Sequence, residues 1–391
     1  MSDDSFTEVT EESWFSRIGN AIKGILIGLV FFAGSFFLLF WNEGRSVQTY
    51  KTLKEGGKSV ISISSDRVDP ANAGKLMHMT GKAVTTATLS DPDFGVSVQA
   101  LKLGRVVEMY QWEEKKESET QKKVGGGSET ITKYTYNKTW SASPISSAGF
   151  KKPEGHQNPN SMRYSSAEYV AEPITVGAFK LSPSLAGQLR PFTPLAIKAD
   201  QPLPAGVKGK LENNGIYIGK NSASPEIGDL RVSFKVVNPG DVSIVAQQVG
   251  DTFEPFVAKA GGTIELLQPG VFSAASMIKT AEKSNAMLTW ILRGVGFLLM
   301  FMGLALMLKP LSVLADVLPI LGDIVSAGTG IISFLLAAVL SVTIIAIAWI
   351  VYRPFLGIIL IAAAVGVVVL IRGRLQNAKA KKVKAAPVTT G

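Results

Sequence analysis

Long uncharged apolar stretches constrain this chain more than any other feature. Residues 24–41 read GILIGLVFFAGSFFLLFW, and further apolar stretches occupy residues 286–308, 324–351 and 354–371. A helix of about 20 apolar residues crosses the roughly 30 Å hydrocarbon core of a bilayer. The sequence therefore predicts four transmembrane helices, one N-terminal and three C-terminal. A cleaved signal peptide is the alternative for the first stretch, but "NEGRS" after it is a poor cleavage site.

Residues 42–285 have the composition of ordinary soluble protein and predict a β-rich domain. Leu230, Val232 and Phe234 alternate with polar residues, which is typical of a half-buried strand. "NPGD" at 238–241 predicts a turn into a return strand of the same meander, and "NNG" at 213–215 predicts a hairpin. From Ser273 the pattern turns helical and continues into the second span. The predicted fold class is an α+β membrane protein with a large β-rich extracytoplasmic domain.

Positive charge next to the spans predicts the orientation. Loops rich in Lys and Arg stay in the cytoplasm, so the basic tail, residues 372–391, is predicted to be cytoplasmic. Four crossings then place the N-terminal segment 1–23 in the cytoplasm as well, and residues 42–285 in the periplasm or lumen. These tail cations are also expected to bind anionic lipids: Arg372, Arg374, Lys379, Lys381, Lys382 and Lys384.

Two features complicate this topology. Four cations that follow the first span outnumber Arg17 and Lys23 before it, although long domains translocate largely regardless of charge. Segment 309–323 is too short and too often interrupted to span, and is predicted to be a cytoplasmic interfacial segment. Small residues at four-residue spacing, such as Gly24 and Gly28, predict close helix packing. The other small-residue positions are Ser333, Ala337, Ser341, Ala362 and Gly366.

Arg293 is the ionised residue inside a predicted span. Charges inside membranes often mark an ion or substrate path, which is one interpretation. The other is that Arg293 lies near the outer edge of its span and extends its guanidinium to the lipid headgroups. The second is favoured because the predicted spans contain no Asp or Glu to partner it.

"VVEMYQW" at 106–112 raises the question whether Glu108 is catalytic. Residues 105–140 are predicted to form one long hairpin with its tip near Gly126, which sets Trp112 opposite Trp140. Glu108 then shares a face with Tyr110 and Trp112, and Arg105 or Lys138 are its expected partners. Glycoside hydrolysis would need a second acid about 5–10 Å away, and no sequence feature selects one. A structural carboxylate is therefore favoured.

Composition offers little material for other chemistry. The chain has no cysteine and two histidines, His78 and His156, so no metal site, cofactor site or catalytic residue is predicted. The net charge of +9 is densest in the tail beside a span, whereas a nucleic-acid-binding protein would concentrate cations in its folded domain. No nucleic-acid partner is expected.

Several motifs resemble one known family. They are "WNEGRS" after the first span, "DPDFGVSVQALKLGRVVEMYQWEE", "KYTYNKTW", "GHQNP", "GDLRVSF", "FMGLALM" and "YRP". In this order, from about residue 20 to 374, they are similar to the LUMA family, also called the transmembrane protein 43 family. Scarce histidine and absent cysteine suggest a bacterial member.

The resemblance implies four spans and a lumenal or periplasmic domain, without established catalytic residues. Animal members reside in the endoplasmic reticulum and inner nuclear membrane, and associate with lamins, emerin and themselves. Bacteria lack lamins, so what the resemblance implies for a bacterial member is membrane organisation and self-association.

The function expected from the sequence is that of a non-enzymatic multi-pass membrane scaffold. It would form homo-oligomers and bind an unknown membrane or envelope protein outside the cytoplasm. The expected location is the bacterial inner membrane, or the endoplasmic reticulum and inner nuclear membrane in a eukaryote. The alternatives are a channel or channel subunit that uses Arg293 and, less favoured, an envelope hydrolase that uses Glu108.

Overall fold

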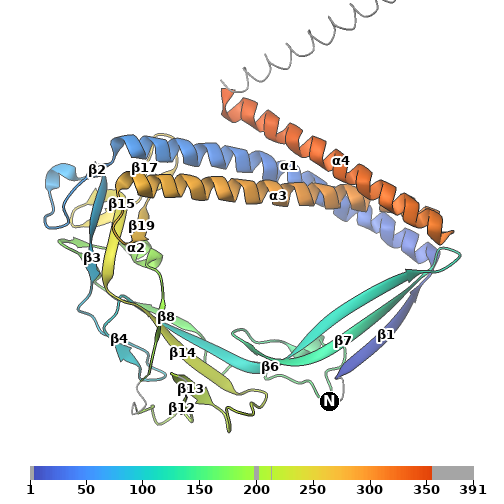
Figure 1. Ribbon diagram of the computed structural model, residues 1–391, viewed down its shortest axis with the longest axis horizontal. Coiled ribbons are helices and arrows are strands. Elements are labelled where there is room, and N and C mark those ends of the chain that lie inside the picture. Colours follow the sequence, from blue (N-terminus) through green and yellow to red (C-terminus); the bar gives the residue numbers. More distant parts are fainter. Residues whose placement is uncertain (1–3, 198–201, 213, 355–391) are drawn as a thin grey trace, which may run out of the picture. The chain divides into compact units, whose positions relative to one another are not determined.

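The computed structural model describes residues 4–197, 202–212 and 214–354, which form two compact units (Figure 1). The β unit comprises Met1–Ser13, Lys51–Lys123 and Gly127–Lys283. The helical unit comprises Trp14–Tyr50, Val124–Gly126 and Ser284–Gly391. Each unit is described by itself below.

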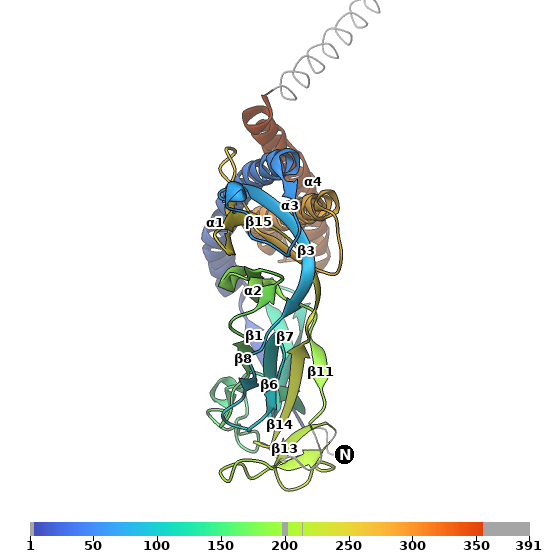
Figure 2. The same cartoon turned by 90° about the vertical axis from the view of Figure 1, so that its left-hand side faces the viewer.

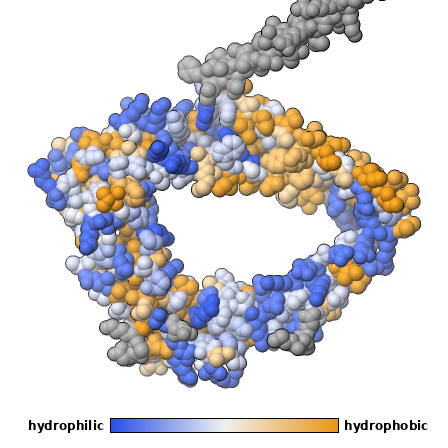
Figure 3. Space-filling model, viewed as in Figure 1, coloured by the Kyte–Doolittle hydropathy of each residue, from blue (hydrophilic) through white to orange (hydrophobic). Residues whose placement is uncertain are grey.

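Three long helices supply most of the helical unit: α1 (Trp14–Ser59), α3 (Ala274–Ala315) and α4 (Pro319–Tyr352). Each is long and apolar enough to cross a membrane. Hydrophobic side chains gather over their apolar stretches (Figure 3), as expected for helices surrounded by lipid. The expected fourth span, 354–371, and the basic tail lie outside the described residues apart from Pro354.

Two predicted helix boundaries are wrong. α1 continues through residues 42–59, which were expected in the β-rich domain, because Val47 and Leu53 extend its buried face. Residues 309–323 form no separate interfacial segment, because α3 runs to Ala315 and α4 begins at Pro319. Proline suits the first turn of a helix, where its missing N–H has no partner to lose.

The start of α3 agrees with the prediction. The hydroxyl Oγ of Ser273 accepts a hydrogen bond from the backbone N–H of Ser276 at 3.3 Å, which caps the helix. α3 then runs without interruption into the predicted second span.

The first sheet of the β unit has eight strands in the order β1-β7-β6-β14-β13-β12, with β11 paired to β14 and β8 to β6. All of its pairings are antiparallel. The strands are β1 (Ser5–Glu12), β6 (Lys102–Lys122), β7 (Ser128–Ser141), β8 (Ala167–Val170), β11 (Thr193–Leu195), β12 (Lys210–Glu212), β13 (Gly215–Ile218) and β14 (Leu230–Val237).

The second sheet has seven strands in the order β10-β9-β3-β15-β16, with β19 on β15 and β2 on β3. Figure 2 shows β3 and β15 side by side. The strands are β2 (Ile61–Ser62), β3 (Leu76–Val84), β9 (Thr175–Val176), β10 (Phe179–Lys180), β15 (Gly240–Val249), β16 (Thr252–Glu254) and β19 (Leu266–Pro269).

Short elements complete the β unit. Two small ribbons pair β4 (Leu89–Ser90) with β5 (Ser97–Val98), and β17 (Phe256–Val257) with β18 (Thr263–Ile264). Helix α2 (Pro183–Gln188) and two 3₁₀ helices, Pro70–Asn72 and Ser147–Gly149, lie in the connections.

One apolar core joins the two sheets of the β unit. Val107, Val232 and Phe234 of the first sheet pack in the same cluster as Met79 and Ile244 of the second. The predicted alternation in β14 is confirmed, because its apolar residues are buried and most of its intervening polar residues face solvent. Burial of this shared core is what holds the two sheets together.

Turn predictions were partly right. β12 and β13 pair antiparallel with Glu212 opposite Gly215, as the hairpin prediction requires. "NPGD" was expected to return the chain within one meander, yet β14 and β15 belong to different sheets. β14 is already paired by β6 and β13 on its two sides, so no edge remains for β15. The turn therefore carries the chain across the core.

The N-terminal segment is part of the first sheet. β1 pairs with β7 over eight residues, from Ser5 opposite Thr135 to Glu12 opposite Ser128. A strand shares the compartment of the strands it pairs with. Residues 5–12 in the cytoplasm and residues 42–285 outside it are therefore incompatible with this pairing.

Candidate functional site

A buried ion pair joins the three helices of the helical unit. Glu43 of α1 is fully buried and accepts two hydrogen bonds from Arg293 of α3, Nε to Oε1 at 2.6 Å and Nη2 to Oε2 at 2.9 Å. Trp349 of α4 donates its indole Nε1 to the same Oε2 at 2.8 Å. Bidentate arginine–carboxylate pairs are among the strongest hydrogen-bonded contacts in proteins. A single carboxylate thus binds a side chain from each of the other two helices.

Two tryptophan rings enclose the cation of this pair. The guanidinium carbon of Arg293 lies 4.6 Å from the ring centroid of Trp290 and 5.7 Å from that of Trp349. Cation–π contacts of this kind strengthen when water is excluded, and the Arg293 side chain is only 14% exposed. The expectation that Arg293 extends to the headgroups is wrong, because it turns inward to Glu43.

Sequence reasoning missed Glu43. The residue lies just beyond Trp41, where the uncharged stretch ends, and was therefore assigned to the soluble domain. The helix does not end with the apolar stretch, and its next turn brings the carboxylate against α3. An acid directly after one span, with a lone arginine inside another, was the signal that could have found the pair.

A series of side-chain hydrogen bonds between α1 and α3 lies next to the ion pair. Asn42 donates Nδ2 to the carbonyl of Thr289 at 3.0 Å. Arg45 donates to Asn285 Oδ1 at 2.9 Å and to Thr289 Oγ1 at 3.1 Å. Asn285 Nδ2 in turn donates to the carbonyl of Ser46 at 3.0 Å. Buried polar groups need such partners, so the "NEGRS" residues fix the register of the two helices.

Small residues bring the helices together, as the sequence predicts. A Cβ on Gly28 of α1 would lie 2.7 Å from the carbonyl oxygen of Gly303 on α3. Ser333, Ala337 and Ser341 form a buried stripe on α4. Close backbone approach is what associates helices in lipid. The remaining small pair, Ala362 and Gly366, lies outside the described residues.

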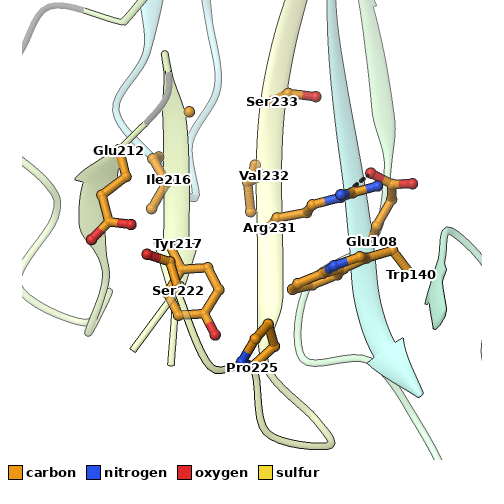
Figure 4. A pocket seen from close by; sticks show the side chains of 11 residues that line it. Glu108, Trp140, Glu212, Ile216, Tyr217, Ser222, Pro225, Arg231, Val232 and Ser233 are labelled. Atoms are coloured by element: carbon orange, nitrogen blue, oxygen red, sulfur yellow. Dashed lines mark hydrogen bonds and ion pairs between the residues drawn. The ribbon is translucent and has the colours of Figure 1, made fainter. Parts of the chain in front are cut away.

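A cleft of about 420 Å³ opens beside Glu108 on the first sheet of the β unit (Figure 4). Glu108 of β6 forms one wall with Arg231 of β14, and Trp140 of β7 lies beside them. Tyr217 of β13 lines it as well, and burial together with a hydrogen bond to Asp229 raises the pKa of that phenol. The cleft has the volume of a small-molecule site.

Glu108 is engaged in an ion pair in this cleft. Its Oε2 accepts a hydrogen bond from Arg231 Nε at 2.6 Å, and the Arg231 guanidinium lies 4.8 Å from the Trp140 ring centroid. The expected partners are wrong, because Arg105 pairs with buried Asp91 and Lys138 covers the Trp112 ring. Arg231 stands directly opposite Glu108 only because β14 pairs with β6.

The register of the long hairpin also differs from the prediction. Tyr110, not Trp112, stands opposite Trp140, with the ring centroids 5.1 Å apart, and Trp112 stands opposite Lys138. The turn is centred on Gly125, one residue before the predicted centre at Gly126. Moving the centre by one residue changes each pairing by two, so the same side chains stay on the same face.

The "GHQNP" turn covers Trp112. His156 meets the Trp112 ring edge-on at 4.8 Å and stacks on Tyr136 at 3.8 Å. Asn158 accepts a hydrogen bond from the Trp112 amide at 2.7 Å and donates to its carbonyl at 2.8 Å. Burial, with a hydrogen bond to Glu114, raises the pKa of Tyr136 to about 12. These contacts pack the half-buried Trp112 against the loop and so give it a structural role.

In the ranges that the structure describes, no group of three or more His, Cys, Asp or Glu side chains is placed to hold a metal ion. The cleft beside Glu108 and the ion pair of Glu43 are two candidate sites in the described part of the chain. The first suits ligand binding, and the second suits helix assembly.

Comparisons with known proteins match almost the whole chain. The profile of the family described as "Transmembrane protein 43" matches residues 109–354. Transmembrane protein 43 of Rattus norvegicus is 36% identical over 385 residues, 95% of each chain. The Homo sapiens protein is 35% identical over 382 residues, covering 95% of this chain and 94% of the relative. The Drosophila melanogaster homolog is 30% identical over 348 residues, covering 86% and 91%.

No solved structure matches the chain. The relatives named above are animal proteins, so the expected bacterial origin finds no support in them.

Proposed function

Because the chain belongs to the transmembrane protein 43 family, we propose that it is a non-enzymatic integral-membrane scaffold. The helical unit anchors the protein and associates with further copies of itself. The β unit presents a binding surface outside the cytoplasm, in a periplasm or lumen according to the source.

The observation that carries this proposal is the junction of Glu43, Arg293 and Trp349. A scaffold must hold its helices in one arrangement, and buried polar contacts can select one register among many. Here the charges satisfy each other and leave no free charge for a transported ion. Such a pair suits a structural role, in which it holds three helices together.

Neither alternative function is favoured by a specific observation. A channel that uses Arg293 needs the guanidinium to face an aqueous path, whereas Arg293 is enclosed by Glu43 and two tryptophan rings. An envelope hydrolase needs Glu108 available as an acid, whereas Glu108 binds Arg231.

Three kinds of partner follow from the proposal. A second copy of the chain binds the helical unit, and anionic lipids bind the basic tail at about 1 kcal/mol per cation near the surface. An unidentified membrane or envelope protein binds the β unit, with the cleft beside Glu108 as its binding surface.

Native mass spectrometry from lipid nanodiscs tests self-association. We expect one dominant oligomer at all protein-to-lipid ratios, because specific contacts rather than crowding set the stoichiometry. A membrane protein known to be monomeric, inserted at the same ratios, controls for chance co-occupancy. Monomers alone, or a random distribution of copies, would argue against a self-associating scaffold.

A further inference from the structure

A second cleft of the β unit, with a volume of about 690 Å³, lies beside helix α2. Its walls come from the loop after β8, the end of β10, α2 and β16. Three apolar side chains on its floor belong to the shared core of the two sheets and are at most 4% exposed, namely Ala171, Ile174 and Phe253. An apolar side chain that enters the cleft would therefore meet the core of the β unit.

The cleft opens where two edges of the second sheet separate. β10 and β16 stand at the two ends of its strand order, and the Lys180 N–H donates to the carbonyl of Asp251 at 2.8 Å. Thr252 Oγ1 donates to the carbonyl of Lys180 at 3.1 Å. Beyond this junction, residues 181–182 and 253–255 line the cleft, and the described structure has no hydrogen bond between them. Extended backbone at the edge of a sheet can pair with a strand from another chain.

Carboxylates outnumber cations on the walls of this cleft. The one cation that lines it, Lys180, is paired with Asp251 at 2.9 Å. Glu265 accepts hydrogen bonds from the hydroxyls of Ser182 and Ser184, which orient its carboxylate without neutralising it. Three lining carboxylates thus have no cation to balance them among the described lining residues: Glu172, Glu254 and Glu265. A ligand that enters the cleft gains most if it carries positive charge.

We propose that this cleft binds an extended segment of a partner protein in which an apolar residue is flanked by Lys or Arg. Successive side chains of an extended chain point to opposite faces. The apolar one then packs toward Phe253 on the floor, and the flanking cations turn to the exposed carboxylates of Glu172 and Glu254. The backbone of the segment adds a strand where β10 and β16 separate, which is a common way to bind peptides.

Charge selects this partner over a lipid. An anionic headgroup would be repelled by the three carboxylates, and a neutral one would leave them unbalanced. The inference does not depend on the scaffold proposal, because that proposal assigns its partner to the cleft beside Glu108. Either can fail without the other.

Fluorescence anisotropy of a short labelled peptide in which Lys and Val alternate tests the proposal, with the full-length protein in nanodiscs of neutral lipid. We expect saturable binding that weakens as salt is added, because partly exposed charges are screened. Two peptides of the same length are matched controls. Glu in place of Lys should abolish binding, and Ser in place of Val should weaken it several-fold. No saturable binding of the Lys–Val peptide would overturn the proposal, as would equal displacement by spermine, a cation without apolar side chains.

Charge-removing variants assign the bound peptide to one cleft. Glu254→Gln and Glu265→Gln should each weaken binding about three- to fivefold, the effect of losing one partly exposed charge pair. Glu212→Gln removes the same charge from the cleft beside Glu108 and should leave the affinity unchanged. Equal losses from all three would show unspecific attraction to an acidic surface, and a loss from Glu212→Gln alone would assign the peptide to the other cleft. Either result overturns the proposal.

A steric variant tests the same cleft without changing its charge. Gly187 of α2 lines the cleft, and a Cβ there meets nothing within 4 Å, so Gly187→Phe fills open space without a clash. It should weaken peptide binding about tenfold or more, because the ring takes the place of the ligand. Gly149→Phe is the matched control, because a Cβ there also meets nothing within 4 Å and Gly149 does not line the cleft. Unchanged binding to Gly187→Phe would place the peptide elsewhere and overturn the proposal.

Discussion

At the scale of single residues, Glu43 carries the largest energetic consequence in the helical unit. An isolated carboxylate in an apolar environment is very costly, so it needs a counter-ion and hydrogen-bond donors. Arg293 and Trp349 supply three donors between them. Each member depends on the others, because removing one leaves a buried group without its partner.

Glu43→Gln and Arg293→Gln should each destabilise the protein by about 3–5 kcal/mol, since each leaves one buried charge unpaired. The double variant should lose less than the sum of the two, because both charges are gone. Unfolding in lipid or mild detergent measures these differences. Lys180→Gln, which breaks the exposed pair with Asp251 at 2.9 Å, is the control and should cost under about 1 kcal/mol. Strictly additive losses from Glu43 and Arg293 would contradict a coupled pair.

The sequence could identify single residues of interest but not their partners. Arg293 and Glu108 were both singled out, and both form ion pairs with residues that were not considered, Glu43 and Arg231. Each pair joins elements that are far apart in the chain, so local patterns carry no information about it. Partner choice was set by helix packing in one case and by strand order in the other.

At the scale of elements, close approach of α1 and α3 depends on glycine. Gly28 and Gly303 face each other so closely that a side chain on either would meet backbone atoms of the other helix. Backbone cannot move aside as a flexible side chain can. The two helices must therefore separate or shift to admit even one methyl group.

Gly28→Ala should accordingly weaken the helical unit by about 1–3 kcal/mol through overpacking. Gly34→Ala is the matched control on the same helix, because a Cβ there meets nothing within 4 Å. It should be neutral or slightly stabilising, since alanine is the better helix former. Thermal unfolding in nanodiscs compares the two, and equal effects would disprove the close contact.

β1 is held at the sheet edge by ion pairs that respond to acid. Hydrogen bonding to Lys151 lowers the pKa of Glu8 below its ordinary value of 4.5, and hydrogen bonding to Lys123 lowers that of Glu11. A lowered pKa in the folded state means that the stabilisation is complete above about pH 4.5 and is lost as the pH falls through the folded pKa.

Hydrogen exchange of residues 5–12 should therefore be steady from about pH 5 to 8 and lose protection below about pH 4. Protection factors corrected for intrinsic exchange remove the direct effect of pH. Lys151→Gln should reproduce part of the loss at pH 7, while the central strand β15 serves as the internal control. Full protection of β1 at pH 3 would show that these pairs do not hold the strand.

Single helices and strands were predicted more reliably than the order in which the strands pair. The long hairpin, β14, the capped start of α3 and α4 all follow from period, turn residues and apolar length. The sheet to which β15 belongs did not follow, because it depends on which strand edges are already occupied. Strand order is decided by pairings between distant segments, which one sequence does not display.

At the scale of the whole molecule, the pairing of β1 decides on which side of the membrane the N-terminal segment lies. β1 and residues 51–59 of α1 both belong to the β unit, although the apolar stretch of α1 separates them in sequence. Residues 1–13 contain five acids and no Lys or Arg, so they lack the charge that retains a segment in the cytoplasm. With both of its ends in the β unit, α1 cannot cross the bilayer once from one side to the other, so the predicted single crossing by the first span is incompatible with the pairing of β1 and β7.

Single cysteines at Thr7 and Ala223 should then react with a membrane-impermeant maleimide from the same side of sealed vesicles. A cysteine at Ala386 in the basic tail is the control and should react from the other side. Labelling of Thr7 together with Ala386 would mean that β1 leaves the sheet when the protein is in its membrane.

Pairing of β1 with β7 also bears on the order of events during synthesis. Residues 5–12 leave the ribosome first, yet the partner of Glu12 is Ser128, which is translated only after α1 and most of β6. The first strand of the nascent chain must wait, unpaired, until the hairpin has been made and delivered to its compartment. Pairing of β1 with the sheet is therefore a late step. In any product that terminates before residue 128, residues 5–12 would have no strand to pair with.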